Sequence, residues 1–82
     1  MEKTVRVLLF ASLREELGWH EREIKHIPGL RIKDLLHNLL PSTKTFQIAS
    51  SILVAKNQQY VDEEAEIFPN DEIALIPPVS GG

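Results

Sequence analysis

The sequence predicts an α+β domain in which a mixed sheet of about five strands packs on one main helix, with a short additional helix. Apolar residues recur with a helical period in one segment and with a period of two in several others. Turn residues separate these segments in the order strand, short helix, strand, helix, strand, strand, strand. The chain has 82 residues and no internal repeat, so we expect one domain.

The first two elements are a strand and a short helix. Residues Thr4–Phe10 alternate, and both faces of this segment carry apolar side chains. We therefore expect this strand to lie inside the sheet rather than at an edge. Ser12 and Glu15 have the spacing of a capping box, and Gly18 suits the left-handed residue that ends a helix. A helix of little more than one turn follows the strand.

The main helix is the clearest element. Before it, Glu21–Ile27 alternates charged and apolar residues and stops at Pro28-Gly29, which is typical of a strand and a turn. The helix then carries one apolar stripe at helical spacing, made of Ile32, Leu35, Leu36, Leu39 and Leu40. This stripe needs a sheet to cover it. Pro41 ends the helix.

The last third of the chain predicts three strands. Ile52–Ala55 forms a strand, Asn57-Gln58 forms a turn, and Tyr60-Val61 begins a short return strand. Pro69-Asn70-Asp71 is a turn that leads into the final strand, Glu72–Ile76.

Composition excludes several classes of function. A net charge of −3 and a pI near 5.5 leave no basic stripe for a phosphate backbone, so we expect no nucleic acid partner. No apolar run could span a membrane, and we expect a cytoplasmic protein. The chain has no cysteine and no phosphate-binding loop, and His20, His26 and His37 match no zinc signature. We therefore expect surface histidines, no bound metal or cofactor, and no catalytic machinery.

The chain ends in Pro77-Pro78-Val79-Ser80-Gly81-Gly82, which we interpret as a flexible tail (77–82) after a folded domain (1–76). Paired glycines reach backbone conformations closed to other residues and fit a slot too narrow for side chains. The carboxylate of Gly82 is an anion at neutral pH and a poor electrophile. Conversion to an acyl-adenylate would supply a leaving group, so a partner must provide the ATP site, magnesium and sulfur.

The sequence resembles the small, sulfur-carrying subunits of molybdopterin synthase, which are members of the ubiquitin-like β-grasp superfamily. The resemblance is carried by Val7–Ala11, Leu13–Glu15, Val54–Gln58, Asn70–Ala74 and Pro77–Gly82. The ending is the most specific part, because Gly-Gly alone equally suggests a thiamine-pathway sulfur carrier or a ubiquitin-like modifier. The chain departs from the family at Pro69-Asn70, where Asp-Gly is frequent, and at Arg31, where Ser or Thr usually caps the main helix.

The resemblance implies a two-stage cycle in which this chain is a non-catalytic, sulfur-donating subunit. An adenylating enzyme of the ubiquitin-activating type would use ATP and magnesium to activate Gly82, and a sulfurtransferase would replace AMP to leave a thiocarboxylate. The tail would then enter the large catalytic subunit of molybdopterin synthase and donate sulfur to the pterin precursor. The family assembles as a heterotetramer of large and small subunits.

A partner must also recognise a surface beside the tail. If Ile73 and Leu75 pack on the helix, Ile76 faces outward with Phe10 and Tyr60, and we expect these three residues to bind partners. Three other functions stay open at this point: a sulfur carrier for another pathway such as thiamine synthesis or tRNA thiolation, a covalent modifier of lysines, and a passive interaction domain.

Overall fold

The computed structural model describes residues 2–40 and 52–77. Its elements are β1 (Thr4–Leu9), α1 (Ser12–Leu17), β2 (Glu21–Lys25), α2 (Ile32–Leu39), β3 (Leu53–Lys56), β4 (Gln59–Val61) and β5 (Glu72–Ile76). This order confirms the prediction element by element. The predicted helix end at Pro41 and the tail residues Pro78–Gly82 lie outside the described residues.

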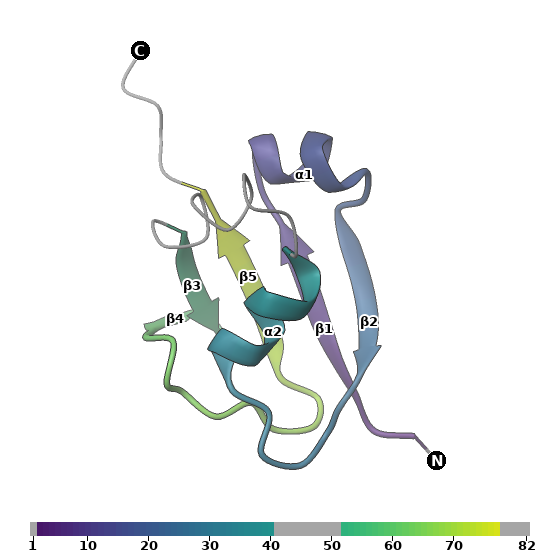
Figure 1. Ribbon diagram of the computed structural model, residues 1–82, viewed down its shortest axis with the longest axis vertical. Coiled ribbons are helices and arrows are strands. Elements are labelled where there is room, and N and C mark those ends of the chain that lie inside the picture. Colours follow the sequence, from purple (N-terminus) through teal and green to yellow (C-terminus); the bar gives the residue numbers. More distant parts are fainter. Residues whose placement is uncertain (1, 41–51, 78–82) are drawn as a thin grey trace.

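The strands form one mixed sheet in the order β2-β1-β5-β3-β4. β1 and β5 are parallel, and the other neighbouring pairs are antiparallel. The helix α2 crosses one face of the sheet, and α1 lies at the end of the sheet where β1 and β5 finish (Figure 1). The α+β class and the interior place of the first strand are therefore confirmed.

The hydrophobic core lies between α2 and the inner face of the sheet. Val5, Val7 and Leu9 of β1 and Ile73 and Leu75 of β5 have no exposed surface. From the helix, Ile32, Leu35 and Leu36 pack into the same cluster. Full burial of one such side chain contributes about 1.5–3 kcal/mol, so this layer is the main source of stability.

The two helices begin differently from the predicted caps. The capping box at Ser12 is wrong: Ser12 is already helical, and the cap position is Ala11, at φ 51° and without a side-chain hydrogen bond. Gly18 ends α1 at φ 81°, as predicted. At α2 the Asp34 carboxylate accepts a hydrogen bond of 3.0 Å from the backbone N–H of Arg31. Arginine has no acceptor, so this single bond replaces the usual reciprocal pair.

Polar bonds fix the turns next to β5. Asn57, Gln58 and Asn70 have positive φ, which confirms both predicted turns. The nearly buried Asp71 carboxylate accepts hydrogen bonds from the Asn57 side-chain amide (2.9 Å) and the Phe68 backbone N–H (2.8 Å). The Asn57 side-chain oxygen in turn accepts a bond from the Glu72 N–H (2.9 Å). These bonds connect the β3–β4 turn to the start of β5.

One histidine is not the free surface residue that we expected. His26 is half-buried, and its Nε2 lies 2.8 Å from the carbonyl oxygen of Ile67. A carbonyl only accepts, so Nε2 donates and the imidazole has a structural role. Within residues 2–40 and 52–77, no helix has the length and apolar character needed to cross a membrane.

Candidate functional site

The outer face of the sheet, opposite α2, carries an exposed apolar surface. Strand register places its members together: Leu8 pairs with Ala74, Leu53 with Ile76, and Ala55 with both Ala74 and Tyr60. Phe10 continues the alternation of β1 beyond Leu8, and its N–H donates to the carbonyl of Leu75 (3.2 Å). We call this surface the apolar face; it consists of Leu8, Phe10, Leu53, Tyr60, Ala74 and Ile76, with the nearly buried Ala55 between them.

The three residues predicted to bind partners, Phe10, Tyr60 and Ile76, all lie on the apolar face. Phe10 and Tyr60 are 37% and 72% exposed, and Ile76 is half-buried. Ile73 and Leu75 are buried on the other side of β5, which is the condition that the prediction of an outward Ile76 required. An apolar surface of this kind is typical of a protein-binding site.

An arginine lies beside Phe10. The Arg14 guanidinium carbon is 5.5 Å from the centre of the Phe10 ring, and its Nε donates to the Leu9 carbonyl oxygen at 2.8 Å. Because α1 starts directly after β1, this cation sits at the end of the apolar face where β5 finishes. The site therefore combines apolar side chains with one positive charge at its rim.

The base of the predicted tail lies at the same end of the face. Ile76 ends β5, and Pro77 is buried, so the first residue of the predicted tail packs against the domain. The division at residue 77 stays a prediction. Pro78, Val79, Ser80, Gly81 and Gly82 lie outside the described residues. The apolar face thus begins at the point from which the Gly-Gly end follows within a few residues.

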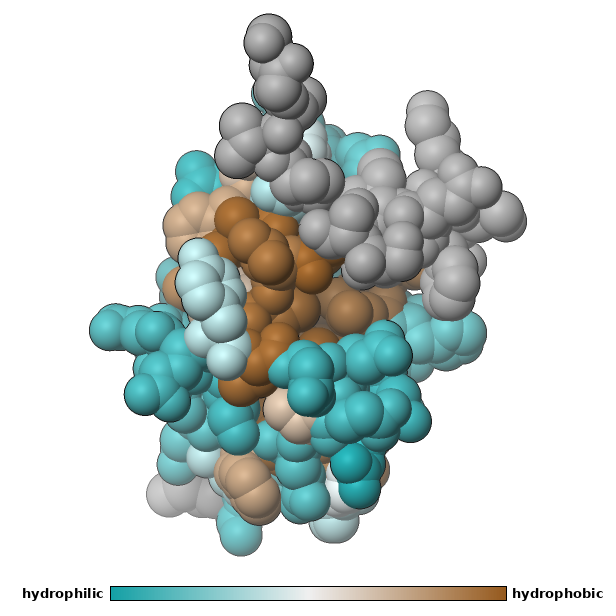
Figure 2. All heavy atoms as spheres, turned by 90° about the vertical axis from the view of Figure 1, so that its left-hand side faces the viewer, coloured by the Kyte–Doolittle hydropathy of each residue, from teal (hydrophilic) through white to brown (hydrophobic). Residues whose placement is uncertain are grey.

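A second apolar area opens on the β3–β4 side of the molecule. Figure 2 looks at this side and shows hydrophobic side chains gathered at the surface with hydrophilic residues around them. Between α2 and the strands, a shallow groove of about 220 Å³ is lined by Ile32, Leu36, Ile52, Val54 and Val61, with Asp62 and Glu63 at its rim. Its lining residues lie on the helix side of the sheet and include no residue of the apolar face.

Sequence reasoning missed Leu53 and Arg14. Leu53 is 52% exposed and sits directly opposite Ile76. The sequence shows that Leu53 and Ala55 lie on the same face of their strand. It does not show which strands pair with this one, so that face could not be assigned to the inner or outer side of the sheet. Arg14 follows Phe10 by four residues, yet helical spacing does not apply because Ala11, at φ 51°, breaks the backbone between them. Only the fold brings the two side chains together.

The sequence of this chain matches one protein family and is similar to curated members of it. Residues 7–82 match the model of the ThiS family. The chain is 35% identical to a molybdopterin synthase sulfur carrier subunit of Arabidopsis thaliana, over 95% of this chain and 82% of that protein.

Among solved structures, small archaeal modifier protein 1 of Methanosarcina acetivorans superposes with a TM-score of 0.75 at 27% identity, covering 100% of this chain and 99% of that one. A chain from a complex of subunits 1 and 2 of molybdopterin-converting factor from Helicobacter pylori has a TM-score of 0.65 at 24% identity, over 96% and 99% of the two chains. The last likeness supports the fold alone.

Proposed function

This chain belongs to the ThiS family, and we propose that it is the sulfur carrier subunit of a molybdopterin synthase. The observation that carries the proposal is the exposed apolar face at the base of the tail. Phe10, Tyr60 and Ile76 lie there on one surface, although burial of such side chains is normally favourable. A carrier that hands its terminus to another protein needs such a surface, because docking must hold the terminus at the partner's reacting groups.

The chemistry of the cycle takes place at Gly82, the residue that we propose as the site of adenylation and thiocarboxylate formation. The carboxylate oxygen attacks the α-phosphate of ATP bound by a separate adenylating enzyme, which releases pyrophosphate and leaves an acyl-adenylate. A sulfur nucleophile at the oxidation level of sulfide, supplied by a sulfurtransferase, then attacks the acyl carbon, displaces AMP and leaves a thiocarboxylate. Transfer of that sulfur to the pterin precursor, with water replacing it at the carbonyl, returns the carboxylate. This chain positions its own terminus, and its partners hold ATP and magnesium.

The partners follow from this role. We propose that the large catalytic subunit and the adenylating enzyme dock on the apolar face in turn, with the tail from Pro77 to Gly81 threading into each active site. The relative's description as a subunit of a synthase supports the first partner. The Helicobacter pylori neighbour, solved as a complex of subunits 1 and 2, has the same fold. We further propose that the assembly is a heterotetramer in the cytoplasm.

One alternative has its own support. The likeness to small archaeal modifier protein 1, at 27% identity over the whole chain, favours a protein modifier whose Gly82 is joined to target lysines. The same activated carboxylate would serve both roles, since an amine attacks an acyl-adenylate as sulfur does. The two functions therefore differ in the product and not in the carrier.

Intact-mass analysis of the chain from its own cells tests the proposal. A carrier shows a population in which one oxygen has been replaced by sulfur, and this population should grow when the large subunit is removed. A matched chain with one alanine added after Gly82 should show no such population, because its carbonyl is displaced from the reacting groups. Lysine conjugates without thiocarboxylate would establish the modifier instead. An unchanged carboxylate under both conditions would contradict the carrier role and leave a passive domain.

A further inference from the structure

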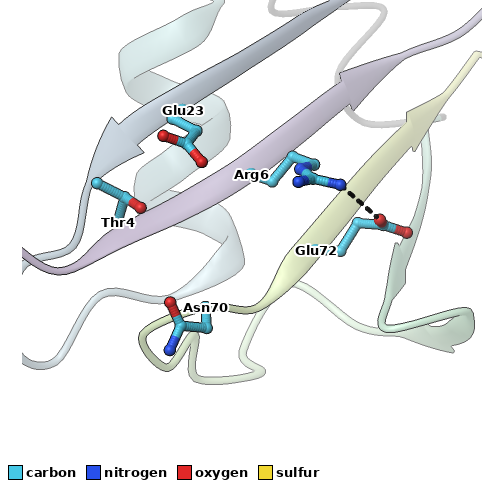
Figure 3. Close-up of a pocket in the computed structure, with 5 residues that line it drawn as sticks. All are labelled: Thr4, Arg6, Glu23, Asn70 and Glu72. Atoms are coloured by element: carbon cyan, nitrogen blue, oxygen red, sulfur yellow. Dashed lines mark ion pairs between the residues drawn. The ribbon is translucent and has the colours of Figure 1, made fainter.

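The outer face of the sheet has a second half, which is polar. Below the apolar face, β1, β2 and the start of β5 form an open pocket of about 280 Å³ lined by Thr4, Arg6, Glu23, Asn70 and Glu72 (Figure 3). Arg6 pairs in register with Glu23 on β2 and with Glu72 on β5, so the three side chains share one face. We call this the polar pocket.

Negative charge is in excess at the polar pocket. Among the described residues that line it, Arg6 is the one cation, and its guanidinium lies 3.8 Å from carboxylate oxygens of both Glu72 and Glu21. These separations are longer than hydrogen bonds, and both ion pairs are largely exposed, so Arg6 is only loosely held. Strand register places Glu21, Glu23 and Glu72 near Arg6 on this face, and it places Lys25 beside Thr4 at the edge of the pocket, where Lys25 pairs with Glu2 at 3.7 Å. Carboxylates therefore still outnumber cations on this part of the face.

Two polar groups of the pocket are unused within the described part of the chain. Figure 3 shows Arg6 directed toward Glu72 and away from Glu23, and no described residue forms an ion pair with Glu23. The Asn70 side chain likewise bonds to no described residue, although the Asn70 backbone is fixed by a 2.8 Å bond from its N–H to the Thr4 carbonyl. A carboxylate and an amide oxygen therefore stand ready to accept hydrogen bonds from a cationic group.

The polar pocket continues the apolar face without a break. The Arg6–Glu72 pair and the Leu8–Ala74 pair are two residues apart on the same strands and point to the same side. Two residues of strand span about 7 Å. A stable interface covers about 800 Å² on each partner. A protein centred on Phe10 and Ile76, on the strands β1 and β5 that also line the pocket, would therefore extend over the pocket.

We propose that the polar pocket receives a lysine or arginine side chain of the large synthase subunit when that subunit docks on the apolar face. This inference rests on the proposed function. The apolar face supplies contact area, and the pocket supplies charge complementarity, which acts mainly on the rate of association and on partner choice. Glu23 is the residue best placed to meet the incoming cation, because the neighbouring Glu72 is already shared with Arg6.

Charge reversal at Glu23, compared with the same change elsewhere, tests the proposal. We compare Glu23→Lys with Glu63→Lys, a matched control on the loop whose Glu63 carbonyl accepts a bond from the first turn of α2, on the other side of the sheet. Association with the purified large subunit is measured by stopped flow from low to high salt. Glu23→Lys should associate about tenfold more slowly at low salt and approach wild type at high salt, whereas Glu63→Lys should follow wild type throughout.

Two further variants and a second partner, the adenylating enzyme, make the result decisive. Glu23→Gln removes charge without placing a lysine opposite Arg6, and should show a smaller loss of the same sign if Glu23→Lys folds poorly. Equal rates for Glu23→Lys and Glu63→Lys, or a loss seen only with the adenylating enzyme, would overturn the inference. Phe10→Ala separates the two proposals. If wild type binds the large subunit and Phe10→Ala binds it more weakly, docking on the apolar face is supported, whatever the Glu23 variants show. A wild-type chain that binds no large subunit would overturn both.

Discussion

The two faces of this sheet are built from the same strands and carry similar apolar side chains, yet one face is buried and the other is partly exposed. On the inner face, Val7, Leu9 and Leu75 have no exposed surface because α2 covers them. On the outer face, Phe10 and Leu53 stay partly open, although they are equally hydrophobic. The difference teaches that apolar character does not by itself mark a core. What separates the two faces is whether this chain supplies a cover.

The consequence is a division of free energy between folding and binding. Apolar area removed from water contributes about 25 cal/mol per Å² wherever it is buried. The inner face realises that contribution when the chain folds, whereas the outer face would realise part of it only on the docking that we propose. Substitutions on the inner face should therefore affect unfolding, while matched substitutions on the outer face should affect association.

The largest effect on unfolding is expected for Leu75→Ala. Leu75 is fully buried between Leu9 and Val54 of the neighbouring strands, so truncation leaves a cavity under α2. We expect the free energy of unfolding to fall by about 2–5 kcal/mol, measured by urea denaturation. Leu53→Ala is the matched control, since the same change occurs on the outer face at a half-exposed side chain; it should cost less than about 1 kcal/mol. Equal losses would mean that the two faces do not differ in this way.

Phe10→Ala, on the outer face, should weaken binding and leave the free energy of unfolding nearly unchanged. We expect binding to the large subunit and to the adenylating enzyme to weaken by about 2 kcal/mol, or about thirtyfold in Kd, because a central aromatic anchor is lost. Calorimetric titration measures both affinities. Phe68→Ala is the control, because Phe68 is similarly exposed but contacts Lys56 and lies outside the apolar face. A large drop in melting temperature for Phe10→Ala would show that its ring supports the fold instead.

Most of the fold was predictable because its signals are local. The stripe on α2, the alternation of β5 and the turn residues Asn57 and Asn70 each lie within a few positions of the structure that they determine. The cap of α1 was not predictable from spacing. The backbone at Ala11 has positive φ, which is uncommon for a residue other than glycine and carries no sequence signal here, and Ser12 is the first helical residue.

The candidate site divides in the same way. Alternation placed Ile76 outward once Ile73 and Leu75 were assigned to the helix side, and Phe10 and Tyr60 followed. The polar pocket had no such signal. Arg6, Glu23 and Glu72 belong to three different strands, and they meet only because β1 pairs antiparallel with β2 and parallel with β5. Pairing between distant segments is set by the whole sheet, and no local period reports it.

A smaller effect is expected at Asn57, which stabilises the sheet through polar bonds instead of burial. Asn57→Gly keeps the positive φ of the turn but removes the bonds to Asp71 and Glu72. We expect a loss of about 1–2 kcal/mol in unfolding free energy, with affinity for the large subunit unchanged. The control is Gln58→Gly in the same turn, also at positive φ, which should not destabilise. A loss of affinity in Asn57→Gly would mean that the turn itself contacts the partner.

The smallest effect should come from Tyr60→Ala, which tests how much the edge of the apolar face contributes to binding. Tyr60 lies on the edge strand β4, pairs with Ala55 and is 72% exposed, so its ring buries little area in the free chain. Unfolding should change by no more than about 0.5 kcal/mol. In the docking that we propose, the ring would lie at the rim of the interface, where contacts contribute less than central anchors do. We therefore expect a two- to fivefold rise in Kd, or about 0.5–1 kcal/mol.

Tyr60→Phe separates the ring from its hydroxyl. If apolar contact matters, Tyr60→Phe should bind the large subunit like wild type, and calorimetry on the three chains should rank Tyr60→Ala between wild type and Phe10→Ala. A Tyr60→Ala defect as large as that of Phe10→Ala would place Tyr60 at the centre of the interface. The docked partner would then be centred nearer to β3 and β4, and the polar pocket beside β2 would fall outside its reach.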